Sequence, residues 1–149
     1  MAGFTTYMDL ALTEARAAAA RGETPVGAVI VRDGHVLAMA GNRTRELSDP
    51  TAHAEMLAIR EACRLMSSER LPETDLYVTL EPCPMCAAAI SAARIGRVYF
   101  GAPDAKSGGV EQGPRIFSHP QCHHKPEVYA GIGETESAEL LRGFFKGRR

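Results

Sequence analysis

The hexapeptide EPCPMC at residues 81–86 holds two of the chain's four cysteines, separated by two residues and flanked by prolines. Pro84 suits the first turn of a helix, where a missing backbone N–H costs little. A helix that begins here would place the sulfurs of Cys83 and Cys86 on one side of its first turn. Free N–H groups and the helix dipole favour thiolates at that position. The stretch therefore predicts a reactive or metal-binding pair of cysteines at a helix N-terminus.

Three interpretations of this pair remain open on the hexapeptide alone. It is a redox dithiol of a thioredoxin-like fold, half of a zinc site, or two cysteines that only pack. The flanking prolines make packing the weakest of the three, because a core helix needs no such start.

The pentapeptide TAHAE at residues 51–55 favours zinc. A catalytic zinc ion has three protein ligands and keeps a fourth position for water. His53, Cys83 and Cys86 form such a set, and we expect one zinc ion per chain. Glu55 lies about 200° around an ideal helix from His53. It is therefore expected to act on the metal-bound water as a general acid and base, not as a fourth ligand.

The rest of the chain reads as alternating helices and strands. A helical pattern covers roughly 5–21, and two strands (25–31 and 35–40) flank Asp33-Gly34, a strong hairpin signal. Residues 102–126 predict a long loop with one helical turn. The remaining expected elements are a helix from about 52, a strand at 75–80, a helix at 84–94, strands at 97–101 and 127–132, and a closing helix marked by Leu141, Phe144 and Phe145.

This order predicts an α/β fold. An antiparallel hairpin followed by alternating helices and strands implies parallel crossovers behind the hairpin. We therefore expect a three-layer α/β/α sandwich around a mixed five-stranded sheet. With 149 residues and no visible linker, residues 1–149 are expected to form one domain.

Composition excludes several classes of protein. Apolar residues make up 45% and charged residues 23%, so the chain is not disordered, and a net charge of −1 gives no general attraction to nucleic acid. One end is basic, since Arg142, Lys146, Arg148 and Arg149 follow Leu140 without an acid. No apolar run reaches membrane-spanning length, no segment reads as a signal peptide, and the cysteine spacings do not suggest a disulfide framework. We expect a cytoplasmic protein.

The two motifs also carry a resemblance. HAE followed by PCPMC is similar to the signature of the zinc-dependent deaminases of the cytidine deaminase superfamily. Within it, the chain resembles the bacterial tRNA-specific adenosine deaminases nearly end to end. The similar segments are PVGAVIV, GNR, DPTAHAEMLAIR, LYVTLEPCPMC, ARIGRVYFGAPDAKSG and FFKGRR. The resemblance implies a cytidine deaminase-like fold.

The resemblance further implies a hydrolase that converts adenosine to inosine at the wobble position, the first anticodon base, of a tRNA. Zinc would activate the water and Glu55 would shuttle the proton. Family members act as homodimers in which both subunits hold the anticodon stem-loop, and no membrane is involved.

Further positions match the family's substrate contacts. Asn42 would hold the edge of the purine, while Asp104 and Lys106 lie in the segment similar to the family's tRNA-contacting loop. Asp104 suits a ribose 2′-hydroxyl, a group that DNA lacks. Phe145 and Arg149 in the closing segment would stack on a base and contact a phosphate. Pro103 departs from the family pattern, which has a more polar or basic residue there.

Two alternatives stay open. A guanine deaminase, or another enzyme acting on a free base or nucleoside, would use the same metal site with a closed pocket. A non-catalytic RNA-binding subunit would keep zinc for folding but would have no need of Glu55. The cluster Cys122-His123-His124 is expected to be a surface loop and not a second metal site, and Cys63 is expected in the core.

Overall fold

The computed structural model describes residues 6–147 of the 149-residue chain. The elements follow the predicted order, with small differences at their ends. They are α1 (Tyr7–Ala20), β1 (Gly27–Arg32), β2 (His35–Gly41), α2 (Ala54–Met66), β3 (Asp75–Leu80), α3 (Pro84–Ala92), β4 (Arg97–Ala102), the 3₁₀ turn η1 (Ile116–Ser118), β5 (Glu127–Tyr129) and α4 (Glu134–Lys146).

The five strands form one mixed sheet in the order β2-β1-β3-β4-β5. β1 pairs antiparallel with β2 and β3, whereas β3 with β4 and β4 with β5 are parallel pairs. Asp33 and Gly34 join β1 to β2 with φ angles of 50° and 76°, as a primed hairpin turn requires. The predicted α/β sandwich with a mixed five-stranded sheet is confirmed.

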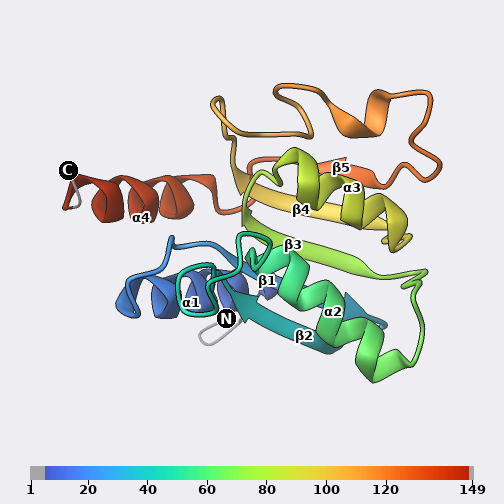
Figure 1. Cartoon of the computed structure of the whole chain (residues 1–149), viewed down its shortest axis with the longest axis horizontal. Helices are drawn as coiled ribbons and strands as arrows, with labels where there is room; N and C mark the ends of the chain where they lie inside the picture. Colours follow the sequence, from blue (N-terminus) through green and yellow to red (C-terminus); the bar gives the residue numbers. More distant parts are fainter. Residues whose placement is uncertain (1–5, 148–149) are drawn as a thin grey trace.

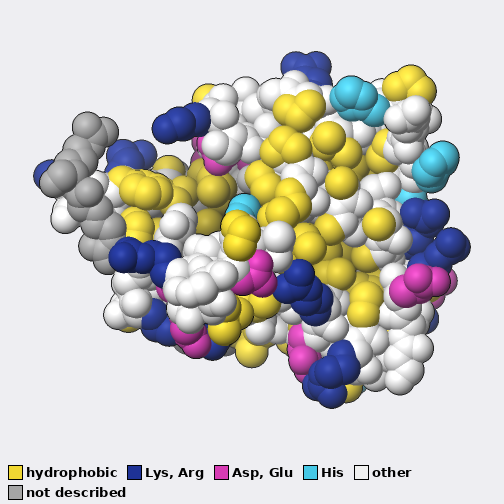
Figure 2. All heavy atoms as spheres, viewed as in Figure 1, with side chains coloured by type: hydrophobic (Ala, Val, Ile, Leu, Met, Phe, Trp, Pro, Cys, Tyr) yellow, Lys and Arg dark blue, Asp and Glu magenta, His cyan; other side chains and the backbone are white. Residues whose placement is uncertain are grey.

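Alternate residues of the strands bury opposite faces of the sheet. Ala28 and Ile30 of β1 belong to the larger core cluster, under α2 and α3. Val29 and Val31 belong to the smaller cluster, with Met8 and other side chains of α1. Figure 1 shows α2 and α3 side by side across the sheet. In Figure 2 hydrophobic side chains gather on the molecular surface over α3.

A row of tyrosines crosses the second face. Tyr77, Tyr99 and Tyr129 are register partners on β3, β4 and β5. Their rings stack, with centroids 4.5 Å apart for the first pair and 4.9 Å for the second. Tyr7 of α1 continues the row at 5.4 Å from Tyr77. Such aromatic pairs stabilise a sheet by cross-strand packing.

The last strand is shorter than predicted. The sequence predicts a strand over 127–132, but β5 ends at Tyr129. Gly131 and Gly133 then take positive φ angles of 81° and 73°, which turns the chain out of the strand and into α4.

Two hydrogen bonds attach the start of α4 to the ends of the central strands. The buried Ser137 hydroxyl donates to the carbonyl oxygen of Thr79 on β3. The N–H of Ile132 donates to the carbonyl of Phe100 on β4, at 3.0 Å. From there α4 extends past the end of the sheet, on the left of Figure 1. Within residues 6–147 no helix is long and apolar enough to cross a membrane.

Candidate metal centre and substrate cavity

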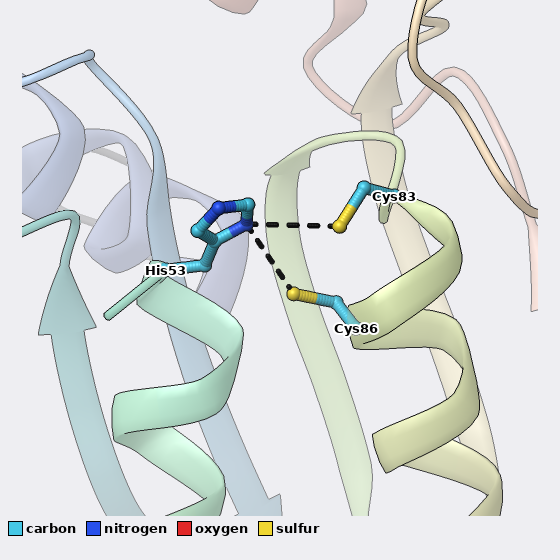
Figure 3. A group of neighbouring side chains, drawn as sticks. All are labelled: His53, Cys83 and Cys86. Carbon is cyan, nitrogen blue, oxygen red and sulfur yellow. Dashed lines mark hydrogen bonds between the residues drawn. The ribbon is translucent and has the colours of Figure 1, made fainter. Parts of the chain in front are cut away.

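Two helix N-termini carry the predicted metal ligands. His53 is the N-cap residue of α2 and Cys83 that of α3, both with extended backbones. N-cap side chains usually accept a hydrogen bond from the first turn. Neither His53 nor Cys83 makes such a bond. Their side chains instead point toward each other in the space between the helices, where Cys86 joins them from the first turn of α3 (Figure 3).

The distances suit a zinc ion. Nδ1 of His53 lies 3.7 Å from Sγ of Cys83 and 3.6 Å from Sγ of Cys86. A tetrahedral ion with bonds of about 2.3 Å to sulfur and about 2.0–2.1 Å to nitrogen spans a sulfur–nitrogen edge of about 3.6 Å. Among the described residues, these three are the one group of His, Cys, Asp or Glu side chains close enough to hold a metal. The donor set therefore fits zinc.

The pKa values of the Cys83 and Cys86 thiols shift in opposite directions. Hydrogen bonds from Cys86 and His53 lower the pKa of Cys83 to about 4. The hydrogen bond to Cys83, together with burial, raises the pKa of Cys86. One thiolate is thus stabilised by the other thiol and by the imidazole. Metal ligation needs deprotonated sulfur, so a bound ion would replace the shared proton.

Glu55 lies in the first turn of α2 and is 4% exposed. Burial raises the pKa of its carboxyl group to about 7. A group that titrates near neutral pH can both accept and release a proton, as general acid–base catalysis requires. Glu55, His53 and Cys83 line one cavity.

This inner cavity has a volume of about 190 Å³. Sites for drug-sized ligands occupy about 300–1,000 Å³, so the cavity suits a single base. Nδ2 of Asn42 donates to Oγ1 of Thr44 at 3.1 Å and to Oε1 of Glu23 at 3.4 Å. A carboxylate only accepts hydrogen bonds, so this contact fixes the orientation of the amide. The lining residues are Thr24, Val26, Asn42, Thr44, His53, Ala54, Glu55, Leu80, Glu81, Cys83, Asp104 and Ser107.

An outer groove of about 750 Å³ adjoins the cavity and shares part of its wall. It brings together Asp104, Lys106 and Phe145, three of the predicted substrate contacts. Phe145 is 50% exposed. Oδ1 of Asp104 accepts hydrogen bonds from the N–H groups of Lys106 and Ser107, at 3.1 and 3.0 Å, which closes a turn. The full lining is Thr24, Leu80, Pro103, Asp104, Ala105, Lys106, Ser107, Leu141 and Phe145.

Arg148 and the predicted phosphate contact Arg149 lie outside the described residues.

The cysteine–histidine cluster at 122–124 does not converge on a common point. Sγ of Cys122 donates to the carbonyl of His124 at 3.1 Å, and Nε2 of His124 lies 2.7 Å from the carbonyl of Ile95. His123 is exposed. Cys63 is half-buried and packs against the larger core cluster.

Sequence reasoning missed two buried carboxylates beside the cavity. Glu23 and Glu81 are each 2% exposed. For Glu81 the signal was present, because this acid directly follows a buried strand and no Lys or Arg occurs between Arg70 and Arg94. A buried acid with no cation nearby in sequence must find backbone donors.

Comparison with known proteins places these features in context. Residues 3–102, which hold all three candidate ligands, match the cytidine and deoxycytidylate deaminase zinc-binding region. The tRNA-specific adenosine deaminase of Agrobacterium fabrum is 62% identical over 149 residues, which cover 100% of this chain and 98% of that protein.

Two solved structures share this fold, and each is more than 30% identical to the chain in sequence. One, of tRNA:A34 deaminases that carry out A-to-I editing at the wobble position of transfer RNA, has a TM-score of 0.89 and 64% identity, covering 91% of this chain and 98% of that chain. The guanine deaminase of Bacillus subtilis has a TM-score of 0.65 and 31% identity, covering 94% of this chain and 92% of that chain.

Proposed function

Since the chain belongs to the cytidine and deoxycytidylate deaminase family, and within it to the tRNA-specific adenosine deaminases, we propose that it deaminates the wobble adenosine of a tRNA. The reaction consumes water and yields inosine and ammonia. One observation carries the proposal: a base-sized cavity with the His53, Cys83 and Cys86 ligand set opens into a longer groove. A flipped base fits the cavity while flanking nucleotides follow the groove.

His53, Cys83 and Cys86 hold the zinc ion in this proposal. When bound, zinc supplies a water that is activated for attack at neutral pH. Glu55 takes one proton from the water and passes it to the purine ring nitrogen. It then takes the second proton, which remains on the added oxygen, and passes it to the amino group, which leaves as ammonia. Its burial in the wall of the cavity that His53 and Cys83 also line supports this role.

Asn42, which lines the cavity, holds the edge of the purine. Both contacts of its Nδ2 are made within the protein, to Thr44 and Glu23. Its carbonyl oxygen Oδ1 is therefore the group offered to a donor on the substrate.

Asp104, Lys106 and Phe145 contact the RNA that flanks the reacting base. Lys106 is exposed on the groove and supplies a positive charge for a phosphate. Phe145 offers an exposed ring on which an unstacked base can lie. Arg149 continues the basic end of the chain and is assigned a phosphate contact by sequence alone.

The chain works as a homodimer in this proposal. Ala88 and Ala92 are exposed, lie four residues apart on α3 and so share one helix face. They line a groove of about 420 Å³ together with His119, Gln121 and other residues of the following loop. The same region carries the surface hydrophobic side chains seen in Figure 2. A second copy would bury this face and bring its own residues toward the RNA.

We place the enzyme in the cytoplasm, with residues 1–149 as one deaminase domain. Its four cysteines are free thiols, which suits a reducing compartment.

The test is to incubate the purified protein with an anticodon stem-loop that has adenosine at the wobble position, and separately with free guanine. The proposal predicts inosine in the first reaction and no xanthine in the second. A DNA copy of the stem-loop is the control for ribose recognition. Xanthine without inosine would replace the proposal with a guanine deaminase, and neither product from a zinc-loaded protein would favour a non-catalytic RNA-binding subunit.

A further inference from the structure

Glu81 is a buried carboxylate that backbone N–H groups surround. Oε1 accepts a hydrogen bond from the N–H of Asp104 at 3.0 Å. Oε2 accepts three, from Val110 at 3.1 Å, Glu111 at 2.8 Å and Gln112 at 3.0 Å. No Lys or Arg among residues 6–147 forms an ion pair with it. Four donors around one acceptor-only group form a nest.

The four N–H groups belong to the two ends of the loop over residues 103–112. This loop forms a wall of both the cavity and the outer groove, through Asp104 and Ser107. It contains no helix or strand, so its shape depends on such contacts. The Glu81 carboxylate therefore provides the hydrogen-bond acceptors that backbone carbonyl groups would provide in a helix or strand.

The loop is also built closely around this side chain. A Cβ atom at Gly108 would lie 2.6 Å from Cδ of Glu81, so a larger residue cannot enter without moving the carboxylate or the loop. The N–H of Gly109 donates to the carbonyl of Pro82 at 2.8 Å. The loop thus rests on the segment that leads directly into the metal ligand Cys83.

Glu23 holds another segment of the cavity lining, which includes Asn42 and Thr44, in the same way. Its carboxylate accepts hydrogen bonds from the N–H groups of Arg45 and Glu46, at 3.1 and 2.7 Å, and from Nδ2 of Asn42. The two carboxylates lie on different segments and share no hydrogen-bond donor. Substitution of one carboxylate is therefore a control for substitution of the other.

We propose that Glu81 is a positioning residue for the RNA substrate: it fixes the 103–112 loop relative to Cys83 so that Asp104 and Lys106 meet nucleotides next to the reacting base. This inference rests on the proposed function. It assigns Glu81 no contact with the substrate and no part in proton transfer.

Glu81→Gln tests the inference first by amide hydrogen exchange. The amide nitrogen that replaces one oxygen cannot accept, so at least one backbone donor loses its partner. Exchange at Asp104, Val110, Glu111 and Gln112 should become about tenfold faster or more. Arg45 and Glu46 should be unaffected, and Glu23→Gln should give the reverse pattern. Unchanged exchange in the 104–112 segment of Glu81→Gln would overturn the inference.

Kinetics with the wobble-adenosine stem-loop provide the second readout. Glu81→Gln should keep its zinc and raise KM about tenfold, with a smaller change in kcat, because substrate placement is impaired. Glu61→Gln removes an exposed carboxylate that pairs with Arg64, and should behave as the wild type. Equal loss of kcat, zinc and folded protein would show that Glu81 is only structural.

Gly108→Ala disturbs the contact between the loop and Glu81 by adding a Cβ atom on the loop. It replaces Glu81→Gln as the test if Glu81→Gln does not fold. It should also speed exchange at residues 104–112 and raise KM. Should the wild type itself produce no inosine, the proposed function fails, while the exchange pattern still decides whether Glu81 holds the loop.

Discussion

Nδ1 of His53 lies 3.6 Å from Sγ of Cys86, although 33 positions separate the two residues in the chain. The contact joins the N-terminal ends of α2 and α3, which lie over the same face of the sheet. Two helix dipoles thus direct their positive ends at one point, where thiolates are favoured. This convergence is the physical basis of the metal prediction.

Zinc should bind at one ion per chain and should be lost on substitution of a ligand. Cys83→Ser removes a thiolate that a tetrahedral site needs. Metal analysis of the purified variant should show zinc well below one per chain. Cys63→Ser is the matched control, because Cys63 packs against the core away from the ligands and should keep its zinc. Full zinc in Cys83→Ser, or a native Cys83–Cys86 disulfide, would contradict the assignment.

Glu55→Ala should retain zinc and fold but lose turnover by about 10²–10⁴-fold, since it removes proton transfer and spares all three ligands. Inosine formation from the stem-loop and zinc content are measured on the same preparation. Glu61→Ala, an exposed acid on the same helix, should retain activity. Loss of metal from Glu55→Ala would make Glu55 a ligand or a support for one.

The basic end of the chain should contribute to RNA affinity through counterion release. Lys146→Ala should lower the slope of log K against log salt by roughly 0.7–0.9 if its ammonium meets one phosphate. Deleting the last few residues should lower it further. Arg70→Gln is the control, because Arg70 is an exposed cation in the turn before β3, at the opposite end of that strand from the cavity. An unchanged slope after the deletion would show that the basic end of the chain does not contact phosphates and is only a solvated helix end.

The homodimer should depend on the small residues of α3. Ala92→Glu places a charge on the exposed alanine face and should convert the dimer to a monomer in light scattering coupled to gel filtration. Ala17→Glu puts the same change on an exposed alanine of α1 and should leave the dimer intact. A monomeric wild type at micromolar concentration would remove the dimer from the proposal.

Tyr77 is expected to make the free energy of unfolding fall at alkaline pH. Burial raises the pKa of its phenol to about 12, above the ordinary value of 10.0. The folded state therefore favours the neutral phenol, and this stabilisation is present below pH 10 and lost as the pH rises toward 12. Urea unfolding from pH 9 to pH 12 should show a smaller loss of stability for Tyr77→Phe than for the wild type. Equal losses would show that Tyr77 does not control the alkaline transition.

The sequence by itself predicted the order of the helices and strands and a candidate set of metal ligands. Apolar periodicity, the Asp33-Gly34 turn and the proline at the start of α3 are local signals, since each acts on backbone angles within a few residues. The alternation of helices and strands then restricted the sheet to a mixed topology. The two motifs predict His53, Cys83 and Cys86 as ligands and Glu55 as the general acid and base, because these residue types at this spacing suit a catalytic zinc site.

Only the tertiary structure decided how the walls of the site are held. Phe145 lines one groove together with Asp104 and Lys106. Its helix α4 is anchored at the strand ends because the Ser137 hydroxyl donates to the carbonyl oxygen of Thr79. Glu81 gathers four N–H groups from residues 23 to 31 positions away. No local pattern encodes these contacts, because a buried carboxylate selects its donors by the path of the loop around it, and that path exists only in the folded chain.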